Sequence, residues 1–87
     1  MFKKENWKKD NKGKPWTDEE LTVVLSDAPT KENCTKYAKA FKRGRGSIAQ
    51  IYQWAATSEK IIKDKRSDDK YVNQVKRVAR KIVGWVV

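Results

Sequence analysis

Residues 34–58 read CTKYAKAFKRGRGSIAQIYQWAATS, and this stretch decides the fold. In its first half, apolar side chains recur every three or four residues, the spacing of one buried helix face: Cys34, Tyr37, Ala38 and Phe41. Gly44 and Gly46 follow in a basic turn, where we expect them to end this helix and permit a sharp change of direction. A second helix then begins at Ser47, which is placed to form a capping box with Gln50. The stretch therefore predicts a helix over about 31–42, capped by Thr30 or Asn33, a tight turn, and a helix over about 47–58.

The helix predicted over 47–58 has one apolar side. At 100° per residue this side holds Ile48, Ile51, Tyr52 and Ala55. Ala49, Gln50 and Gln53 then face outward, and Trp54 sits at the boundary. The opposite register, with Trp54 inward, would expose two isoleucines and bury a glutamine, at a cost of several kcal/mol. The helix either ends at Thr57-Ser58 or runs on to about Lys65, because the pattern is compatible with both.

Two further helices flank this pair. The run Thr17-Asp18-Glu19-Glu20 is a capping box, so it predicts a helix over about 17–27 that ends before Pro29. An amphipathic helix is predicted over about 68–83, capped by Ser67 or Asp68 and followed by Gly84 in the left-handed conformation. Its apolar side holds Tyr71, Val72, Val75, Val78, Ala79 and Ile82, and its cations cover the rest: Lys70, Lys76, Arg77, Arg80 and Lys81. This apolar side and the terminal Trp85-Val86-Val87 either fold onto the core or form a homodimer.

The composition of the 87 residues excludes several classes of protein. The chain has no histidine and one cysteine, which excludes zinc fingers, His-based catalysis and an intramolecular disulfide. We therefore expect no enzyme, no metal and no cofactor, and Cys34 is interpreted as a core thiol. No apolar run is typical of a signal peptide or a membrane span, so we expect no membrane partner. We expect the protein to lie in the cytoplasm, associated with the nucleoid. If a phage encodes the chain, we expect it in the cytoplasm of the host cell.

The net charge of +10 is unevenly distributed. Residues 42–66 carry seven Lys or Arg against two acids, whereas residues 17–41 carry three against five. Such clustering is typical of a protein that binds a polyanion. Residues 1–15 are Lys-rich and contain Gly13 and Pro15, so they predict a flexible basic arm before a single helical domain over 16–87. Trp7 in this arm either docks on the domain or helps the arm bind a partner.

The segment Pro15-Trp16-Thr17-Asp18-Glu19-Glu20-Leu21, with two more helices and a Gly-containing turn before the third, resembles the Myb/SANT-like domain. In that family a Trp-Thr-x-Glu-Glu segment opens the first helix, and core aromatics recur about every twenty residues. Here Trp16, Tyr37 and Trp54 are 21 and 17 residues apart. The likeness covers about residues 14–58. It implies an all-α, three-helix helix-turn-helix core, extended by the C-terminal helix over 68–83, whose third helix enters the major groove of DNA.

The candidate DNA-binding residues form two groups. Arg43 and Arg45 precede the helix over 47–58, where we expect them to contact phosphates beside its N-terminal amides. The outward side chains of that helix are expected to meet the bases, because glutamine can pair bidentately with adenine and alanine permits close approach. The complete predicted set is Arg43, Arg45, Ser47, Ala49, Gln50, Gln53, Trp54, Thr57 and Lys60.

The predicted function is sequence-tolerant or modestly specific binding of double-stranded DNA, as a small bacterial or phage transcription regulator. RNA carries the same phosphate charge and is the weaker alternative partner. The alternative function is a protein-interaction module of SANT type that binds and modulates a host protein. Charge distinguishes the two, since protein-binding members tend to have an acidic third helix, whereas residues 42–66 here are strongly basic.

Overall fold

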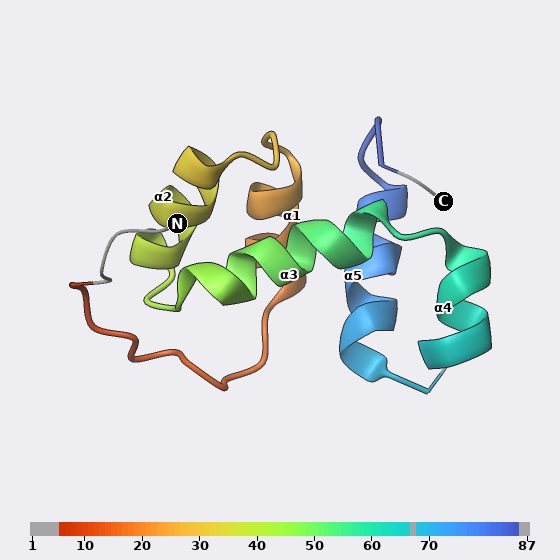
Figure 1. The fold of residues 1–87 in the computed structure, drawn as a ribbon, viewed down its shortest axis with the longest axis horizontal. Helices are drawn as coiled ribbons and strands as arrows, with labels where there is room; N and C mark the ends of the chain where they lie inside the picture. Colours follow the sequence, from red (N-terminus) through yellow and green to blue (C-terminus); the bar gives the residue numbers. More distant parts are fainter. Residues whose placement is uncertain (1–5, 67, 86–87) are drawn as a thin grey trace.

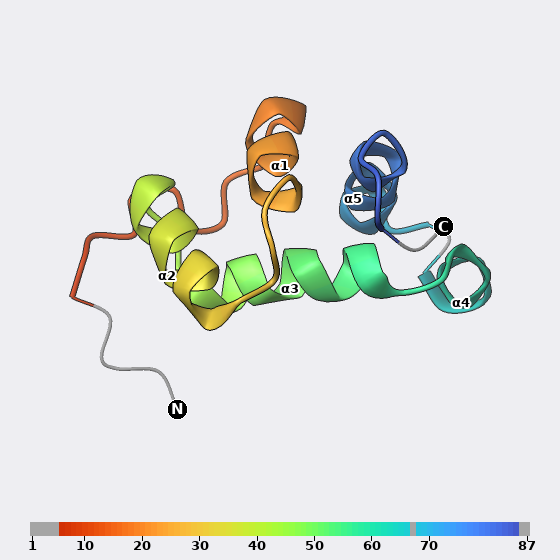
Figure 2. The same cartoon turned by 90° about the horizontal axis from the view of Figure 1, so that it is seen from above.

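A computed structural model describes residues 6–66 and 68–85, and every regular element in these ranges is a helix (Figure 1). The helices are α1 (Asp18–Leu25), α2 (Lys31–Ala40), α3 (Arg45–Ala56), α4 (Glu59–Arg66) and α5 (Lys70–Arg80). α3 runs across the molecule and contacts α1, α2 and α5, with α1 and α5 on one side of it (Figure 2). α4 follows the end of α3 and packs against α5. The predicted all-α class is confirmed.

The helix starts follow the capping chemistry of the sequence in three places. At α1 the predicted capping box is confirmed, since Thr17 Oγ1 accepts from the amide of Glu20 and the Glu20 carboxylate accepts from the amide of Thr17. Thr30 caps α2 as predicted. At α5 the cap is Asp69, whose Oδ1 accepts from the amide of Val72 at 3.0 Å, and not Asp68. Ser67, the other predicted cap, lies outside the described residues.

The end of α2 differs from the prediction that glycines would terminate it. The residue in the left-handed conformation is Lys42, at φ +56°. The amide of Arg43 donates to the Ala38 carbonyl at 2.8 Å, and that of Lys42 to the Lys39 carbonyl at 3.3 Å. This pair of hydrogen bonds is a Schellman motif, which satisfies the last carbonyls of the helix. The two glycines come later in the chain: Gly44 is the N-cap of α3, and Gly46 lies within the first turn of that helix.

α3 begins and ends earlier than predicted. It starts at Arg45 without a side-chain cap, so the predicted capping box at Ser47 is wrong. It ends at Ala56, and the chain turns before the separate helix α4, so α3 does not run on to Lys65. Lys76 of α5 explains this end, since its Nζ donates to the carbonyls of Ala55 at 3.0 Å and Thr57 at 2.8 Å. Lys76 is 1% exposed, whereas the sequence placed it on the polar side of its helix.

The core joins α5 to α1, α2 and α3. Its buried residues are Trp16, Leu21, Val24, Leu25, Cys34, Tyr37, Ala38, Ile48, Ile51, Tyr52, Ala55, Val75, Val78 and Ala79. The prediction that the apolar side of the last helix folds onto its own chain is thus confirmed, although the helix is α5 and not a longer helix over 68–83. Burial raises the pKa of Cys34, as expected of a core thiol.

Trp85 closes the core at the C-terminal end. Its ring stacks on Tyr52 with centroids 5.9 Å apart, and its Nε1 donates to the Leu25 carbonyl at 2.7 Å. Folding back, one of the two predicted outcomes, is confirmed for this residue, so neither the apolar side of α5 nor Trp85 is left as an open dimer surface. Gly84 has φ +105°, as a left-handed residue after the helix should. Val86 and Val87 lie outside the described residues.

Candidate nucleic-acid interface

The outward edge of α3 is arranged as its apolar periodicity predicts. Ile48, Ile51, Tyr52 and Ala55 are buried, and Tyr52 donates its hydroxyl to the Val24 carbonyl at 3.0 Å. Ala49, Gln50, Gln53 and Ala56 are exposed, and Trp54 is half-buried. The predicted register is therefore confirmed. α3 contains no acidic residue, so its outward edge presents only small and amide side chains.

Arg43 is a correction to the predicted interface. Its side chain is 4% exposed, and the guanidinium donates to the carbonyls of Lys14 at 2.8 Å and Pro15 at 3.2 Å. The guanidinium carbon lies 3.9 Å from the centre of the Trp16 ring, a cation–π distance. Arg43 therefore fastens the start of the domain to the α2–α3 turn, with two of its guanidinium nitrogens committed to backbone carbonyls.

Arg45 is also buried, at 5% exposed, and is the second correction. Its guanidinium lies 5.5 Å from the centre of the Trp7 ring, which Lys9 and Lys39 approach at 5.6 and 5.5 Å. The indole Nε1 of Trp7 donates to the Arg43 carbonyl at 2.7 Å. Trp7 therefore docks on the domain, which was one of its two predicted roles.

Residues 6–15, for which the sequence predicts a flexible arm, lie along the α2–α3 turn. The amide and side chain of Asn11 donate to the carbonyls of Lys42 and Phe41, at 3.1 and 2.9 Å. Gly13, at φ +82°, lets the chain turn back toward Trp16. Residues 1–5 of the predicted arm lie outside the described residues.

The other predicted site residues differ in their availability. Ser47 is half-buried beside the groove described next. Thr57 is half-buried and donates its hydroxyl to the Gln53 carbonyl at 2.8 Å, so it belongs to the end of α3. Lys60 is exposed on α4 and forms no ion pair with a described residue. Lys14 and Lys70 are also exposed and form no ion pair with a described residue, and the sequence predicts neither of them as a site residue.

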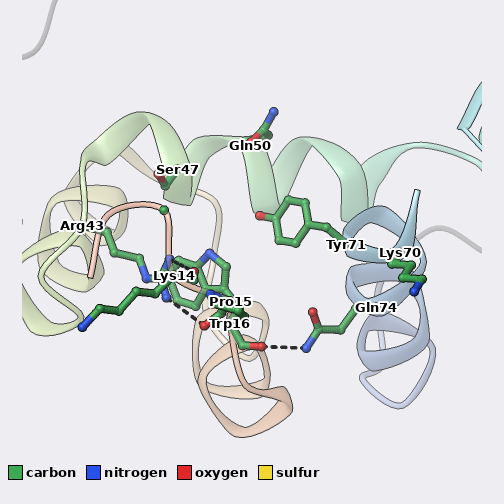
Figure 3. Close-up of a pocket in the computed structure, with 10 residues that line it drawn as sticks. Lys14, Pro15, Trp16, Arg43, Ser47, Gln50, Lys70, Tyr71 and Gln74 are labelled. Atoms are coloured by element: carbon green, nitrogen blue, oxygen red, sulfur yellow. Dashed lines mark hydrogen bonds between the residues drawn. The ribbon is translucent and has the colours of Figure 1, made fainter. Parts of the chain in front are cut away.

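A groove of about 590 Å³ opens beside α3, between the segment before α1 and the start of α5 (Figure 3). Its lining residues are Gly13, Lys14, Pro15, Trp16, Arg43, Ser47, Gln50, Lys70, Tyr71 and Gln74. The Tyr71 hydroxyl points into it, and burial raises the pKa of Tyr71 to about 12 although Arg43 opposes this. Sequence reasoning missed Tyr71, Gln74, Lys14 and Lys70, because three separate segments assemble this groove.

Asp18 and Glu59 pair with side chains of α5, and neither of them lines the groove. Asp18 accepts from Gln74 and from Arg77, both at 2.9 Å, and the hydrogen bond from Gln74 is the main reason that the pKa of Asp18 is lowered. Glu59 pairs with Arg80. No Asp or Glu lines the groove, so the described part of its wall carries only neutral or positive side chains.

Asp27, in the connection between α1 and α2, also accepts hydrogen bonds from side chains. It accepts from the Tyr37 hydroxyl at 2.8 Å and from Lys36 Nζ at 3.1 Å. These hydrogen bonds, that from Tyr37 first, lower the pKa of Asp27 to about 2.

A family model described as "Uncharacterised protein PM1205 C-terminal domain" matches residues 10–86. The chain belongs to this family. The "Uncharacterized protein PM1205" of Pasteurella multocida (strain Pm70) is 47% identical over 72 residues, which are 83% of this chain and 58% of that protein. The chain therefore spans little more than half of this relative. No solved structure matches the chain.

The match to the PM1205 C-terminal domain begins at residue 10 and so includes Asn11 and Lys14, which contact the α2–α3 turn. The family thus extends upstream of α1. Within the described part of the chain, no helix is long and apolar enough to cross a membrane. No cluster of three metal-binding side chains occurs among the same residues.

Proposed function

We propose that this domain binds double-stranded DNA, with the outward edge of α3 in the major groove and nearby lysines on the phosphates. The observation that carries the proposal is the composition of that edge. Ala49, Gln50 and Gln53 are exposed on a helix of 12 residues that has no acidic side chain. Such a helix, about 18 Å long, fits a major groove, where amides can hydrogen-bond adenine and alanines permit close approach.

The sequence predicts that Arg43 and Arg45 contact the phosphates of DNA. Because both are buried, we assign the affinity for phosphates to other cations. The two arginines hold the scaffold, so phosphate contacts are assigned to exposed lysines. The candidates are Lys14 and Lys70, which line the groove beside α3, and Lys60 on α4. The resemblance of residues 14–58 to the Myb/SANT-like domain supports the same docking mode. The lack of acids on α3 favours DNA over the protein tails that SANT-type relatives bind.

Binding of a labelled duplex, followed by fluorescence anisotropy between about 50 and 200 mM salt, tests the proposal. We expect Lys70→Ala to reduce the magnitude of the log–log salt slope by about 1. Lys81→Ala is the matched control, since it removes the same charge at the opposite end of α5 and should leave the slope unchanged.

The double variant Gln50→Ala and Gln53→Ala tests readout by α3. It should bind all duplexes with similar affinity, because each lost amide–adenine pair removes about 1–3 kcal/mol of discrimination. Failure of the wild-type chain to bind any duplex at about 50 mM salt would overturn the proposed function.

A further inference from the structure

The groove beside α3 contains polar groups that the fold does not use. Three polar side-chain groups line it: the hydroxyls of Ser47 and Tyr71 and the side-chain amide of Gln50. None of these side-chain groups hydrogen-bonds a described residue. The hydroxyl of Tyr71 points toward the middle of the groove (Figure 3). With a pKa of about 12, this hydroxyl is protonated at neutral pH and is available as a hydrogen-bond donor.

Gln74 provides a fixed acceptor on the same wall. Its Nε2 donates to the Trp16 carbonyl and to Asp18 Oδ1, both at 2.9 Å. Both donor hydrogens are therefore committed, and the amide oxygen is turned toward Tyr71 and the groove (Figure 3). A donor and an acceptor thus lie on neighbouring turns of α5, with the acceptor held in one orientation.

The remaining surface of the groove is mostly apolar and carries positive charge at its two ends. Pro15 and the ring of Tyr71 supply most of the apolar part, because Trp16 is only 7% exposed and Arg43 lies 3.9 Å from the centre of its ring. Lys14 and Lys70 stand at opposite ends with their ammonium groups directed to solvent (Figure 3). The volume of about 590 Å³ is within the range of small-ligand sites. An aromatic ring for stacking, one donor, one acceptor and flanking cations match a nucleobase with a phosphate on either side.

We propose that this groove binds one unpaired nucleobase, with Tyr71 donating to its polar edge, Gln74 accepting from it, and Lys14 and Lys70 on the adjoining phosphates. The inference rests on the proposed function in one respect, because the base is taken to belong to the DNA that α3 contacts. A free nucleotide presents the same chemistry, and the experiment separates the two sources.

The experiment compares two duplexes of equal sequence, one fully paired and one with a single extra adenine. The full chain should bind the bulged duplex about 5–10-fold more tightly, as expected for stacking plus hydrogen bonding of one base. Tyr71→Phe should remove about 3–10-fold of that preference and leave affinity for the paired duplex unchanged. Tyr37→Phe, which deletes a hydroxyl outside the groove, is the matched control and should keep the full preference.

Adenosine 5′-monophosphate, titrated into the labelled chain and followed by NMR, provides the second arm. If the wild type binds both duplexes equally and the nucleotide does not shift the amides of Tyr71 and Gln74, the inference is wrong while the proposed function stands. If neither duplex binds but the nucleotide shifts those amides, the proposed function fails and the groove binds free nucleotides. Ser47→Ala offers an independent test of the polar wall if the Tyr71 variant does not fold.

Discussion

Replacing Arg43 by alanine separates a structural arginine from a phosphate-binding one. In the folded chain this guanidinium is 4% exposed, donates two hydrogen bonds to the carbonyls of Lys14 and Pro15, and lies 3.9 Å from the Trp16 ring. Hydrogen bonds from a charged donor contribute about 1.5–3 kcal/mol each, and the cation–π contact about 0.5–2 kcal/mol. In the unfolded chain water hydrates the Arg43 guanidinium, and this hydration offsets part of the summed energy of its hydrogen bonds and cation–π contact. We expect Arg43→Ala to lower the free energy of unfolding by about 2–4 kcal/mol.

Thermal unfolding followed by circular dichroism measures this loss. At about 4–8 °C per kcal/mol for a domain of this size, Tm should fall by at least about 8 °C. Lys60→Ala is the matched control, because it removes one positive charge from an exposed site without an ion pair to a described residue. It should change the free energy of unfolding by less than about 0.5 kcal/mol. An Arg43→Ala variant that melts with the wild type but binds DNA more weakly would refute the buried role.

Three further predictions address stability. Lys42→Gly should stabilise the chain by about 1 kcal/mol in urea unfolding, because glycine relieves the φ of +56°, whereas Lys39→Gly within α2 should destabilise it by a similar amount. The pKa of Asp27, about 2, lies below its unfolded value of 3.8, so its stabilisation is complete above pH 3.8 and is lost as pH falls through about 2. Asp27→Asn should flatten the dependence of Tm on pH in that window, and an unchanged profile would contradict the assignment. Tyr52→Phe should cost about 0.5–1.5 kcal/mol by removing the buried hydrogen bond to the Val24 carbonyl, and calorimetry showing no loss would disprove that bond.

The orientation of α3 could be predicted from the sequence because it depends on local periodicity. Two isoleucines, a tyrosine and an alanine recur at helical spacing, and burying them leaves Gln50 and Gln53 outward whatever packs against the helix. The start of α1 is similar, since its capping box involves residues only three apart in the chain.

The roles of the charged side chains could not be predicted in the same way. Arg43 and Lys76 look like surface cations in the sequence, yet both are buried because carbonyls on distant segments accept their hydrogen bonds. The acceptors of Arg43 lie 28 and 29 residues away, and those of Lys76 lie 19 and 21 residues away. Helical periodicity contains no information on such partners. The groove is hidden from the sequence for the same reason, since Tyr71 reaches it from a helix whose packing had to be known first.

The contacts of the segment before α1 bear on how the domain can be isolated. A fragment beginning at Trp16 would keep all five helices but delete both carbonyls that accept from Arg43, as well as the ring of Trp7 that covers Arg45. Arg43 would then lose both hydrogen-bond acceptors of its guanidinium, which is costly for a charge held near the core, and Arg45 would lose the ring that covers it. The shortest autonomous fragment should therefore begin before Trp7, so a truncation chosen at the first helix would discard part of what keeps that helix in place.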